Sequence, residues 1–274
     1  MMKALLVVCH PDDESLWVGA TLAATSLAWD LTWHVVSLSG LDSASSRGDE
    51  FTDAMVAASW GTGRVLGGPL RAASDPLPPM ATTLDEGLTQ DGLAARDFAI
   101  VISHSPFGDE HRNPHHKQAH REVRKWARAH RLPFGFFSPT LIPAGTIRPN
   151  LRSLHRHGPL HATLAGRCRF GPFSKLRYFT WTGSTQTPKY VVQLIGDAAL
   201  KTIMLQSYRS IDQSAHRETY AAFTNALETV YLSDAVGYDL LLRRIEQLPV
   251  PGPDPLFRSL RDFVGIALRR VVGE

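Results

Sequence analysis

The chain has 274 residues, of which 43% are hydrophobic and 20% are charged. This composition allows a sizeable core and excludes disordered, collagen-like and coiled-coil proteins. The two cysteines, Cys9 and Cys168, are too few for a disulfide framework and form no CxxC pair, so any metal must be held by histidine and carboxylate.

The apolar runs of the sequence are short. The first, from Ala4 to Cys9, is shorter than the core of a signal peptide and leads into an acidic loop rather than a cleavage site. No run approaches the ~20 apolar residues that a spanning helix needs. We therefore expect a cytoplasmic protein with no membrane span.

The net charge of +3 conceals an uneven distribution. From Val123 to Gly196 there are twelve Lys or Arg residues and no Asp or Glu, which leaves 17 basic against 26 acidic residues elsewhere. Such a segment is either a solvated face lying against the acidic remainder or a basic wall that binds an anion. It carries no recognisable nucleic-acid motif, so we expect no nucleic-acid partner.

Strand and helix patterns alternate through the first half of the chain. Short apolar runs predict buried parallel strands, and apolar residues at helical spacing predict the helices between them. In chain order the predicted elements are the strand Lys3–Cys9, the helix Glu14–Ala28, the strand Thr32–Ser39, the helix Phe51–Trp60, the short strand Arg64–Leu66, a Gly- and Pro-rich loop over Gly67–Pro79, the strand Phe98–Ser103, the helix Lys117–His130 and the strand Phe134–Phe137.

The pattern changes after Ser138. Residues 139–190 are rich in Gly, Pro, Arg and His, which indicates a lid or extended-loop region in which only Tyr178–Thr182 resembles a strand. Residues 191–274 are predicted to be mainly helical. Helical periodicity returns there in Val191–Tyr208, Glu218–Tyr231 and Pro255–Val271.

This order of elements predicts an α/β fold. Strands that alternate with helices form a mainly parallel sheet with helices on both faces, a Rossmann-like doubly wound arrangement. We expect residues 1–274 to form a single domain, with 1–138 as its core, 139–190 as an irregular lid and 191–274 as a C-terminal extension. Such sheets bind ligands at the carboxyl ends of their strands, which here means after Cys9, Ser39 and Ser103.

An imidazole and three carboxylates follow the first predicted strand. The sequence there is His10-Pro11-Asp12-Asp13-Glu14, on the loop that enters a helix. An acid can cap a helix, and acids complement its positive end, but three of them within one turn also repel one another. The added imidazole at the carboxyl end of a strand favours a functional site over a helix cap.

Histidines gather after the strand that ends at Ser103. Five of the chain's twelve histidines lie between His104 and His120. Neutral imidazole is the commonest protein ligand for zinc, and two histidines with one carboxylate leave a fourth position open for water, as in catalytic zinc sites. Because two such clusters follow neighbouring strands, the sequence predicts a catalytic metal site.

Both clusters resemble the LmbE/PIG-L family of zinc-dependent de-N-acetylases. The signature of that family is Ala-His-Pro-Asp-Asp-Glu, followed about a hundred residues later by His-Pro-x-His. Here Cys9 replaces the alanine, and His10 to Glu14 match. Arg47-Gly48-Asp49-Glu50 is similar to an Arg-x-x-Glu stretch of the family, and Lys201 to Ser210 is similar to a later Lys and Tyr-x-Ser pattern. The resemblance covers residues 3 to 210.

The resemblance implies a role for each matching residue. His10, Asp13 and His116 would bind Zn²⁺, and Asp12 would be the general base for a metal-activated water that attacks an amide. The implied reaction removes the N-acetyl group from an N-acetylglucosamine-type amino-sugar conjugate, a small-molecule substrate. Two histidines and a carboxylate also suit iron, and the sequence indicates no oligomeric state.

One position departs from the family pattern. Asn113 stands where the first histidine of His-Pro-x-His would be, and an amide can donate a hydrogen bond to an oxyanion but cannot deliver a proton to a leaving amine. The proton must then come from Asp12 or from a displaced imidazole, His104, His111 or His115. If none supplies it, the alternative function is a degenerate family member that binds metal and sugar without turnover.

Other residues have a functional and a structural interpretation. Arg47, His111 and His115 are expected to bind substrate, although Arg47 could instead pair with Glu50 or Asp49. His120 shares a helix face with His116, so it either completes an HxxxH metal pair or, as we prefer, packs within the fold. A nucleotide-binding Rossmann protein is disfavoured, because no GxGxxG follows the first strand.

Overall fold

The parallel strands of the sheet come from the first half of the chain. The structure, a computed structural model, describes residues 2–19, 31–40, 47–58, 62–68, 77, 80–109, 113–137, 148–157, 161–195, 198–210 and 227–246. The parallel strands are β1 (Met2–Val8), β2 (Leu31–Ser37), β3 (Thr62–Val65), β4 (Phe98–Ser103) and β5 (Phe134–Phe137). Their order in space, β3-β2-β1-β4-β5, is that of a doubly wound fold. The predicted Rossmann-like α/β class is confirmed.

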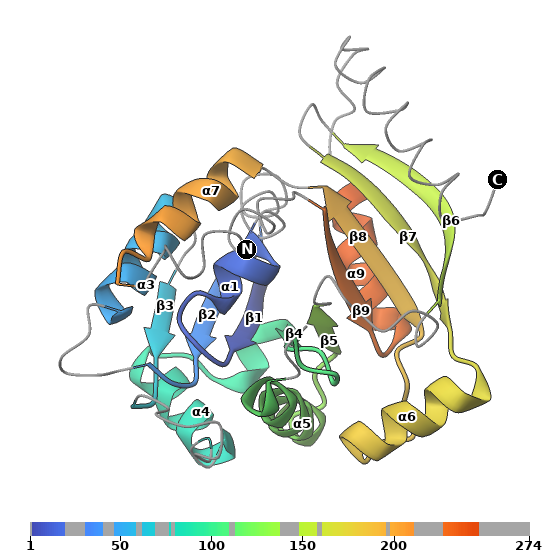
Figure 1. The fold of residues 1–274 in the computed structure, drawn as a ribbon, viewed down its shortest axis with the longest axis horizontal. Helices are drawn as coiled ribbons and strands as arrows, with labels where there is room; N and C mark the ends of the chain where they lie inside the picture. The colour runs from blue at the N-terminus through green and yellow to red at the C-terminus, as the bar shows by residue number, and fades with distance from the viewer. Residues whose placement is uncertain are drawn as a thin grey trace, which may run out of the picture.

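Antiparallel strands extend this sheet on the β5 side. β9 (Leu227–Leu232) pairs with β5, and β8 (Tyr190–Ile195), β7 (His161–Arg169) and β6 (Arg148–His157) follow outward. Within the described residues the strands form one sheet of nine, in the order β3-β2-β1-β4-β5-β9-β8-β7-β6 (Figure 1).

Helices cover both faces of the sheet, because the strand residues that point to each face are apolar. Leu6 of β1 belongs to one buried cluster and Val7 to the other. The first face packs against α1 (Asp13–Trp17), α3 (Arg47–Ala57), α7 (Ala198–Ser207) and α9 (Ala235–Glu246). The second packs against α4 (Met80–Gln90), α5 (Pro114–Ala129) and α6 (Pro172–Thr182), while the short 3-10 helix η1 (Ala95–Asp97) leads into β4.

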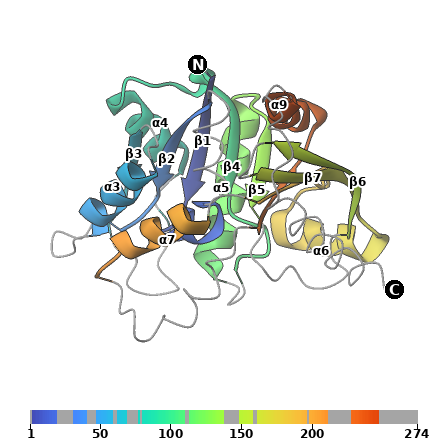
Figure 2. The ribbon, with the colours of Figure 1, turned by 90° about the horizontal axis from the view of Figure 1, so that it is seen from above.

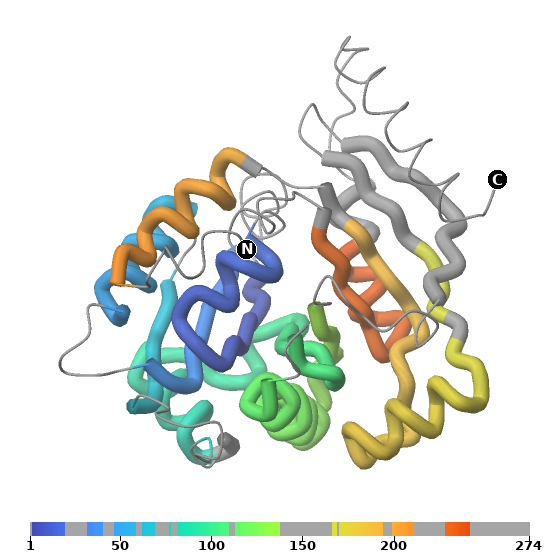
Figure 3. Tube along the Cα trace, in the orientation of Figure 1, coloured from blue at the N-terminus to red at the C-terminus, as the bar shows by residue number. Residues whose placement is uncertain are grey.

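The figures show this layering and bring together distant parts of the sequence. In Figure 2, α3 and α7 lie on one side of the first strands and α4 lies on the other. In Figure 3, α7 runs beside α3, although the strands β3 to β8 lie between them in the chain. The two helices are in contact, so residues near Ser207 come close to the start of α3.

The register of the central strands brings the two predicted clusters together. β1 lies between β2 and β4, with Val8 opposite Ser37 and Leu6 opposite Ile102. The loops after Val8 and after Ser103 therefore leave the same edge of the sheet side by side.

Several predictions for individual elements are wrong beyond residue 170. Tyr178–Thr182 was predicted as a strand but is the end of α6, a helix that begins with Pro172 and ends at Gly183, which has φ 64°. The start of the predicted helix Val191–Tyr208 is strand β8, and Leu227–Tyr231 of the predicted helix Glu218–Tyr231 belongs to β9. Short apolar runs such as these cannot be assigned by periodicity alone.

Two strand predictions are confirmed, and others fall on residues that the structure does not describe. The strands Phe98–Ser103 and Phe134–Phe137 are confirmed residue for residue. Residues 148–157, 161–169 and 172–182 are regular, so the described part of the 139–190 region has more secondary structure than the sequence indicated. The predicted helix Pro255–Val271 and most of the loop Gly67–Pro79 lie outside the described residues. The division of residues 1–274 into one domain with three parts stays a prediction.

None of the helices in the described ranges combines the length and apolarity needed to cross a bilayer.

Candidate metal centre

The loop after β1 is held in an unusual backbone conformation. Asp12 has φ 119°, in a region that residues other than glycine rarely adopt. The amide of His10 donates to Asp13 Oδ2 over 2.8 Å, and the amide of Asp12 donates to Glu14 Oε2 over 3.1 Å. These bonds turn the chain so that the side chains of His10 and Asp13 lie next to each other.

Three donor atoms from two elements come together at the end of this loop. His10 Nδ1 lies 3.3 Å from Asp13 Oδ2, Asp13 Oδ2 lies 3.4 Å from His116 Nε2, and the two imidazole nitrogens are 3.2 Å apart. Zinc bonds of ~2.0–2.1 Å in a tetrahedral site place neighbouring ligand atoms about 3.3 Å apart. The three atoms therefore fit one face of a zinc coordination tetrahedron.

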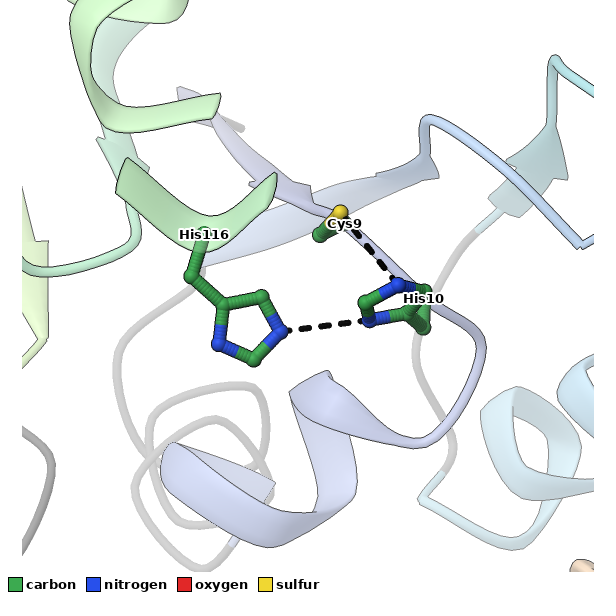
Figure 4. A group of neighbouring side chains, drawn as sticks. All are labelled: Cys9, His10 and His116. Carbon is green, nitrogen blue, oxygen red and sulfur yellow. Dashed lines mark hydrogen bonds between the residues drawn. The ribbon is translucent and has the colours of Figure 1, made fainter. Parts of the chain in front are cut away.

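Each of the three side chains is oriented by a second contact. Trp17 Nε1 donates to Asp13 Oδ1 over 3.3 Å, which leaves Oδ2 facing the two imidazoles. Asp109 Oδ2 lies 3.2 Å from His116 Nδ1. His10 Nε2 lies 3.6 Å from Cys9 Sγ while its Nδ1 points to His116 (Figure 4). Such second contacts orient the two rings and the carboxylate, so that Nδ1 of His10, Oδ2 of Asp13 and Nε2 of His116 face one another and can bind a metal.

Burial and charge also distinguish His116. Burial alone would lower the pKa of His116, but the carboxylates of Asp13 and Asp109 outweigh it and raise this pKa to about 10. Burial opposes the ionisation of Asp109, yet hydrogen bonds from His116 and from the amide of Asn113 lower its pKa to about 2. Two ionised carboxylates thus flank this imidazole and compensate a cation placed at its Nε2.

Within the described ranges, two other groups of donors lie close enough to hold a metal, and both are less suitable. The first replaces His10 by His104, but His104 Nε2 already accepts the amide of Cys9 over 2.8 Å. The second replaces Asp13 by Cys9, but burial raises the pKa of the Cys9 thiol well above its ordinary value, and the thiolate is the form that binds metals. His10, Asp13 and His116 remain the best set.

The cluster is accessible from the side of His10. The side chain of His10 is 23% exposed, whereas those of Asp13 and His116 are 4% exposed. Of the three proposed ligands, His10 is therefore the one most open to solvent.

Asp12 and Arg47 lie close enough to influence each other. Burial and the neighbouring charges of Asp13 and Glu14 raise the pKa of Asp12 well above its ordinary value, and the Arg47 guanidinium partly offsets this. Arg47 is the first residue of α3, which places its charge at the same edge of the sheet as the loop after β1.

Asn113 has a structural role that the sequence analysis missed. It is the N-cap of α5, and its Oδ1 accepts the amide of His115 over 2.9 Å. Its Nδ2 lies 3.5 Å from His116 Nε2. The order Asn113-Pro114 is a common start of a helix and could have indicated the cap. The side-chain amide therefore fixes the helix that carries His116 while standing beside the metal-binding atoms.

Of the other histidines in residues 104–120, one lies beside the site and one packs in the core. His115 is buried, with its ring centroid 6.0 Å from that of His10. His120 donates from Nδ1 to the carbonyl of His104 over 2.7 Å and contacts Phe134, Phe136 and Tyr178. It therefore packs in the core, as preferred over a metal pair. His111 lies outside the described residues.

Residues of α7 and just after it contact the loop that follows β1 with the start of α1 (residues 9–14), α3 and β9. Tyr208 donates to the buried carboxylate of Glu14 over 2.5 Å, and Ser210 donates to Glu50 from its amide and its hydroxyl. Lys201 and Glu228 form a buried ion pair at 2.7 Å. The Lys and Tyr-x-Ser pattern therefore connects α7 to the loop after β1, to α3 and to β9.

Comparisons with known proteins give only distant similarities. No protein-family model matches the chain, and no curated protein matches it. Among solved structures it is similar to the A40926 pseudoaglycone deacetylase, with 17% identity, 84% of this chain and 96% of that chain covered, and a TM-score of 0.43. It is also similar to the zinc-inhibited form of teicoplanin deacetylase, with 14% identity, 85% and 100% covered, and a TM-score of 0.42.

A structure with a different activity gives a comparable similarity. The 4-carboxy-2-hydroxymuconate hydratase of Pseudomonas putida has 15% identity, with 85% of this chain and 97% of that chain covered and a TM-score of 0.44. Because these identities and scores are low, the function must be inferred from the residues of the site.

Proposed function

We propose that the protein is a zinc-dependent hydrolase of the LmbE/PIG-L type that removes the N-acetyl group from an N-acetylglucosamine-type amino-sugar conjugate. The observation that carries the proposal is the triangle of His10 Nδ1, Asp13 Oδ2 and His116 Nε2, with sides of 3.2 to 3.4 Å. The match of His10 to Glu14 with the family signature supports the same function.

The three side chains would hold the metal and leave a position for the substrate. Two imidazoles and one carboxylate are the ligand set of hydrolytic zinc sites with an open coordination position. A zinc ion bound there would polarise the amide carbonyl and lower the pKa of a water molecule beside it.

Asp12 is the proposed general base. It immediately precedes the ligand Asp13, and burial and its acidic neighbours raise the pKa of its carboxyl well above the ordinary value. A carboxylate with a raised pKa accepts a proton more readily. The Arg47 guanidinium partly offsets this rise in the pKa of Asp12, and it can also bind substrate hydroxyls or an anionic group.

His115 is the proposed source of the proton for the leaving amine. Asn113 cannot supply it, because an amide does not release a proton at neutral pH. Of the two imidazoles that could replace it in the described part of the chain, His104 uses Nε2 to accept the amide of Cys9, whereas the buried His115 ring lies edge-on to the ring of His10. Asn113 keeps the role of capping α5 and of donating a hydrogen bond near the metal.

The proposal is tested by metal content together with acetate release from a panel of N-acetylglucosamine conjugates. We expect about one zinc per chain, and a loss of acetate release of at least about a hundredfold in Asp12→Asn. Asparagine tolerates positive φ better than most residues, so this variant removes the carboxylate and keeps the loop. Zinc content should be unchanged in Asp12→Asn, which separates loss of the base from loss of the metal.

Two further variants address the proton donor and the alternative function. His115→Gln should lower acetate release, and the double variant His115→Gln with Asn113→His should recover part of it. If His115→Gln is as active as the wild type, the proton comes instead from Asp12 or from one of the imidazoles His104 and His111. Zinc binding without acetate release, in the wild type and in Asn113→His alike, would instead identify a degenerate metal- and sugar-binding protein.

A further inference from the structure

Helix α6 exposes three large apolar side chains to solvent, while two of its small polar residues are buried. Phe173 is 83% exposed, Leu176 is 60% exposed and Phe179 is 47% exposed. The buried residues of the same helix are Ser174, Tyr178 and Thr182. A helix that only packs on a core has the opposite arrangement, so the exposed face of α6 requires another explanation.

The exposed apolar residues form a ridge with a basic residue on each side. At about 100° per residue, Leu176 and Phe173 lie on either side of the exposed Thr180 at the centre of the outward face, with Phe179 on one flank. Lys175 and Arg177, both exposed, lie on opposite flanks of this ridge. Aromatic and aliphatic residues flanked by Lys and Arg are typical of helices that lie in the interface of a membrane, where the charged ends reach the headgroups.

Basic side chains lie beside α6, with Lys117 5.0 Å from the ring centroid of Trp181 and Arg124 6.0 Å from that of Tyr178. Residues 123–196 contain twelve Lys or Arg and no Asp or Glu. A cavity of about 390 Å³ between α5 and the loop after α6 is lined by Arg124, Arg128 and Arg131. The acidic residue at this cavity, Asp234, is engaged in capping α9, since its Oδ1 accepts the amide of Gly237 over 2.8 Å. Three arginines against one aspartate leave this cavity with a net positive charge, which suits an anionic partner.

The helix is long enough to lie on a membrane and too short to cross one. Its eleven residues span about 16 Å, whereas a crossing helix needs ~20 residues. In Figure 1, α6 lies at the outer edge of the molecule, below the antiparallel strands and away from α3 and α7.

We infer that α6 docks the protein on an anionic phospholipid surface, with Phe173, Leu176 and Phe179 entering the interface and Lys175 and Arg177 contacting lipid phosphates. Helix α6 also contacts the loop that follows β4, close to the metal centre. Trp181, near its end, packs on Phe107 with ring centroids 4.9 Å apart, and Phe107 lies in the loop between His104 and Asn113. Membrane docking would therefore hold this loop close to the lipid surface.

The inference is tested by sedimentation of the full chain with vesicles. The probes are vesicles of phosphatidylcholine alone and of phosphatidylcholine mixed equally with phosphatidylglycerol. We expect binding to the anionic vesicles that weakens with salt, and a fall in the partition coefficient of about tenfold or more in Phe173→Ser/Leu176→Ser/Phe179→Ser. Lys175→Glu/Arg177→Glu should lower binding to the anionic vesicles by a similar factor and leave the weak binding to neutral vesicles unchanged.

The matched control replaces exposed apolar residues on other helices. Val56 on α3 is 72% exposed and Ile203 on α7 is 50% exposed, so Val56→Ser/Ile203→Ser removes apolar surface without touching α6 and should bind vesicles like the wild type. Circular dichroism and the melting temperature confirm that each variant is folded. Equal loss of binding in the control, or no loss in the α6 variant, would overturn the inference.

Measuring the oligomeric state tests whether a second copy of the chain, instead of lipid, covers the exposed face of α6. If the wild type ignores both kinds of vesicle but changes from an oligomer to a smaller species when Phe173, Leu176 and Phe179 are replaced, a second copy of the chain covers α6. A wild type that binds no vesicles and shows no such change would also contradict membrane docking.

Discussion

At the scale of single residues, the metal-binding atoms depend on neighbours that never touch the metal. Asp109 is the clearest case, because its carboxylate holds His116 through Nδ1 at 3.2 Å. We expect Asp109→Asn to weaken zinc binding by about 10- to 100-fold, since it removes the charge that makes His116 a strong ligand. Competition with a chromogenic chelator measures the dissociation constant directly.

The control for this variant is Asp97→Asn. Asp97 is exposed and lies at the amino end of β4, whereas the metal centre lies beyond the carboxyl end of that strand. It should bind zinc like the wild type. Equal affinity in Asp109→Asn and the wild type would mean that Asp109 does not orient His116.

The sequence predicted the donor atoms better than it predicted the residues that orient them. His10, Asp13 and His116 belong to motifs whose residue types and positions on strand ends indicate a metal. Asp109 and Trp17 are ordinary in the sequence, and their roles depend on side-chain directions that spacing does not reveal. The replacement of a histidine by Asn113 was visible, but its use as a helix cap was overlooked although Pro114 follows it.

At the scale of elements, the metal loop is held in place by α7. Tyr208, just after this helix, donates to the buried Glu14 over 2.5 Å. Burial raises the pKa of Glu14, and the bonds from Ser15 and Tyr208 partly offset this. We expect Tyr208→Phe to lower the free energy of unfolding by about 1–3 kcal/mol, because a buried carboxylate loses a hydrogen-bond donor.

Denaturant unfolding of the zinc-loaded and zinc-free protein measures this effect. The destabilisation should be present in both forms, since Tyr208 contacts Glu14 and not a proposed ligand. Thr180→Val is a suitable control, because Thr180 is exposed on α6 and its hydroxyl bonds only within the helix. A variant Tyr208→Phe as stable as the control would show that Glu14 finds another donor.

The elements that the sequence predicted are those whose pattern is decided locally. The strands β4 and β5 are short apolar runs between clear turns, and their bounds were predicted correctly. β8 and β9 are also apolar on both faces, since Val191 and Val192 face opposite sides of the sheet, as do Val230 and Tyr231, but their apolar runs adjoin residues at helical spacing. A strand that is apolar on both faces has no alternation, so its periodicity does not distinguish it from a buried helix. In α6, the exposed Phe173, Leu176 and Phe179 break the apolar periodicity by which a core-facing helix is predicted.

At the scale of the whole molecule, folding buries imidazoles that must stay neutral. Burial lowers the pKa of His34 and lowers that of His120 to about 3. His34 contacts Thr62 and Asp91 between β2 and the end of α4, whereas His120 packs between α5 and the sheet. The two are far apart in the chain and belong to separate environments, so their contributions to the pH dependence of stability should add.

This burial predicts that the protein becomes less stable in acid. In the unfolded chain an imidazole has a pKa of ~6.5, so below that pH the unfolded state binds protons that the folded state excludes. As the pH decreases below ~6.5, the free energy of unfolding therefore decreases by about 1.4 kcal/mol per pH unit for each such histidine. For His120 the fall continues until the pH nears its folded-state pKa of about 3.

The variant His120→Asn isolates one of these protons. Its amide keeps a donor for the carbonyl of His104, which His120 Nδ1 contacts over 2.7 Å, but cannot be protonated. Urea unfolding of zinc-free protein between about pH 7 and pH 4 should give a shallower loss of stability for the variant, by about 1.4 kcal/mol per pH unit. The two curves should run parallel above about pH 7.5, where an imidazole is neutral in both states. Parallel curves over the whole range would mean that His120 binds a proton in the folded protein, and the interpretation of its packing would then be wrong.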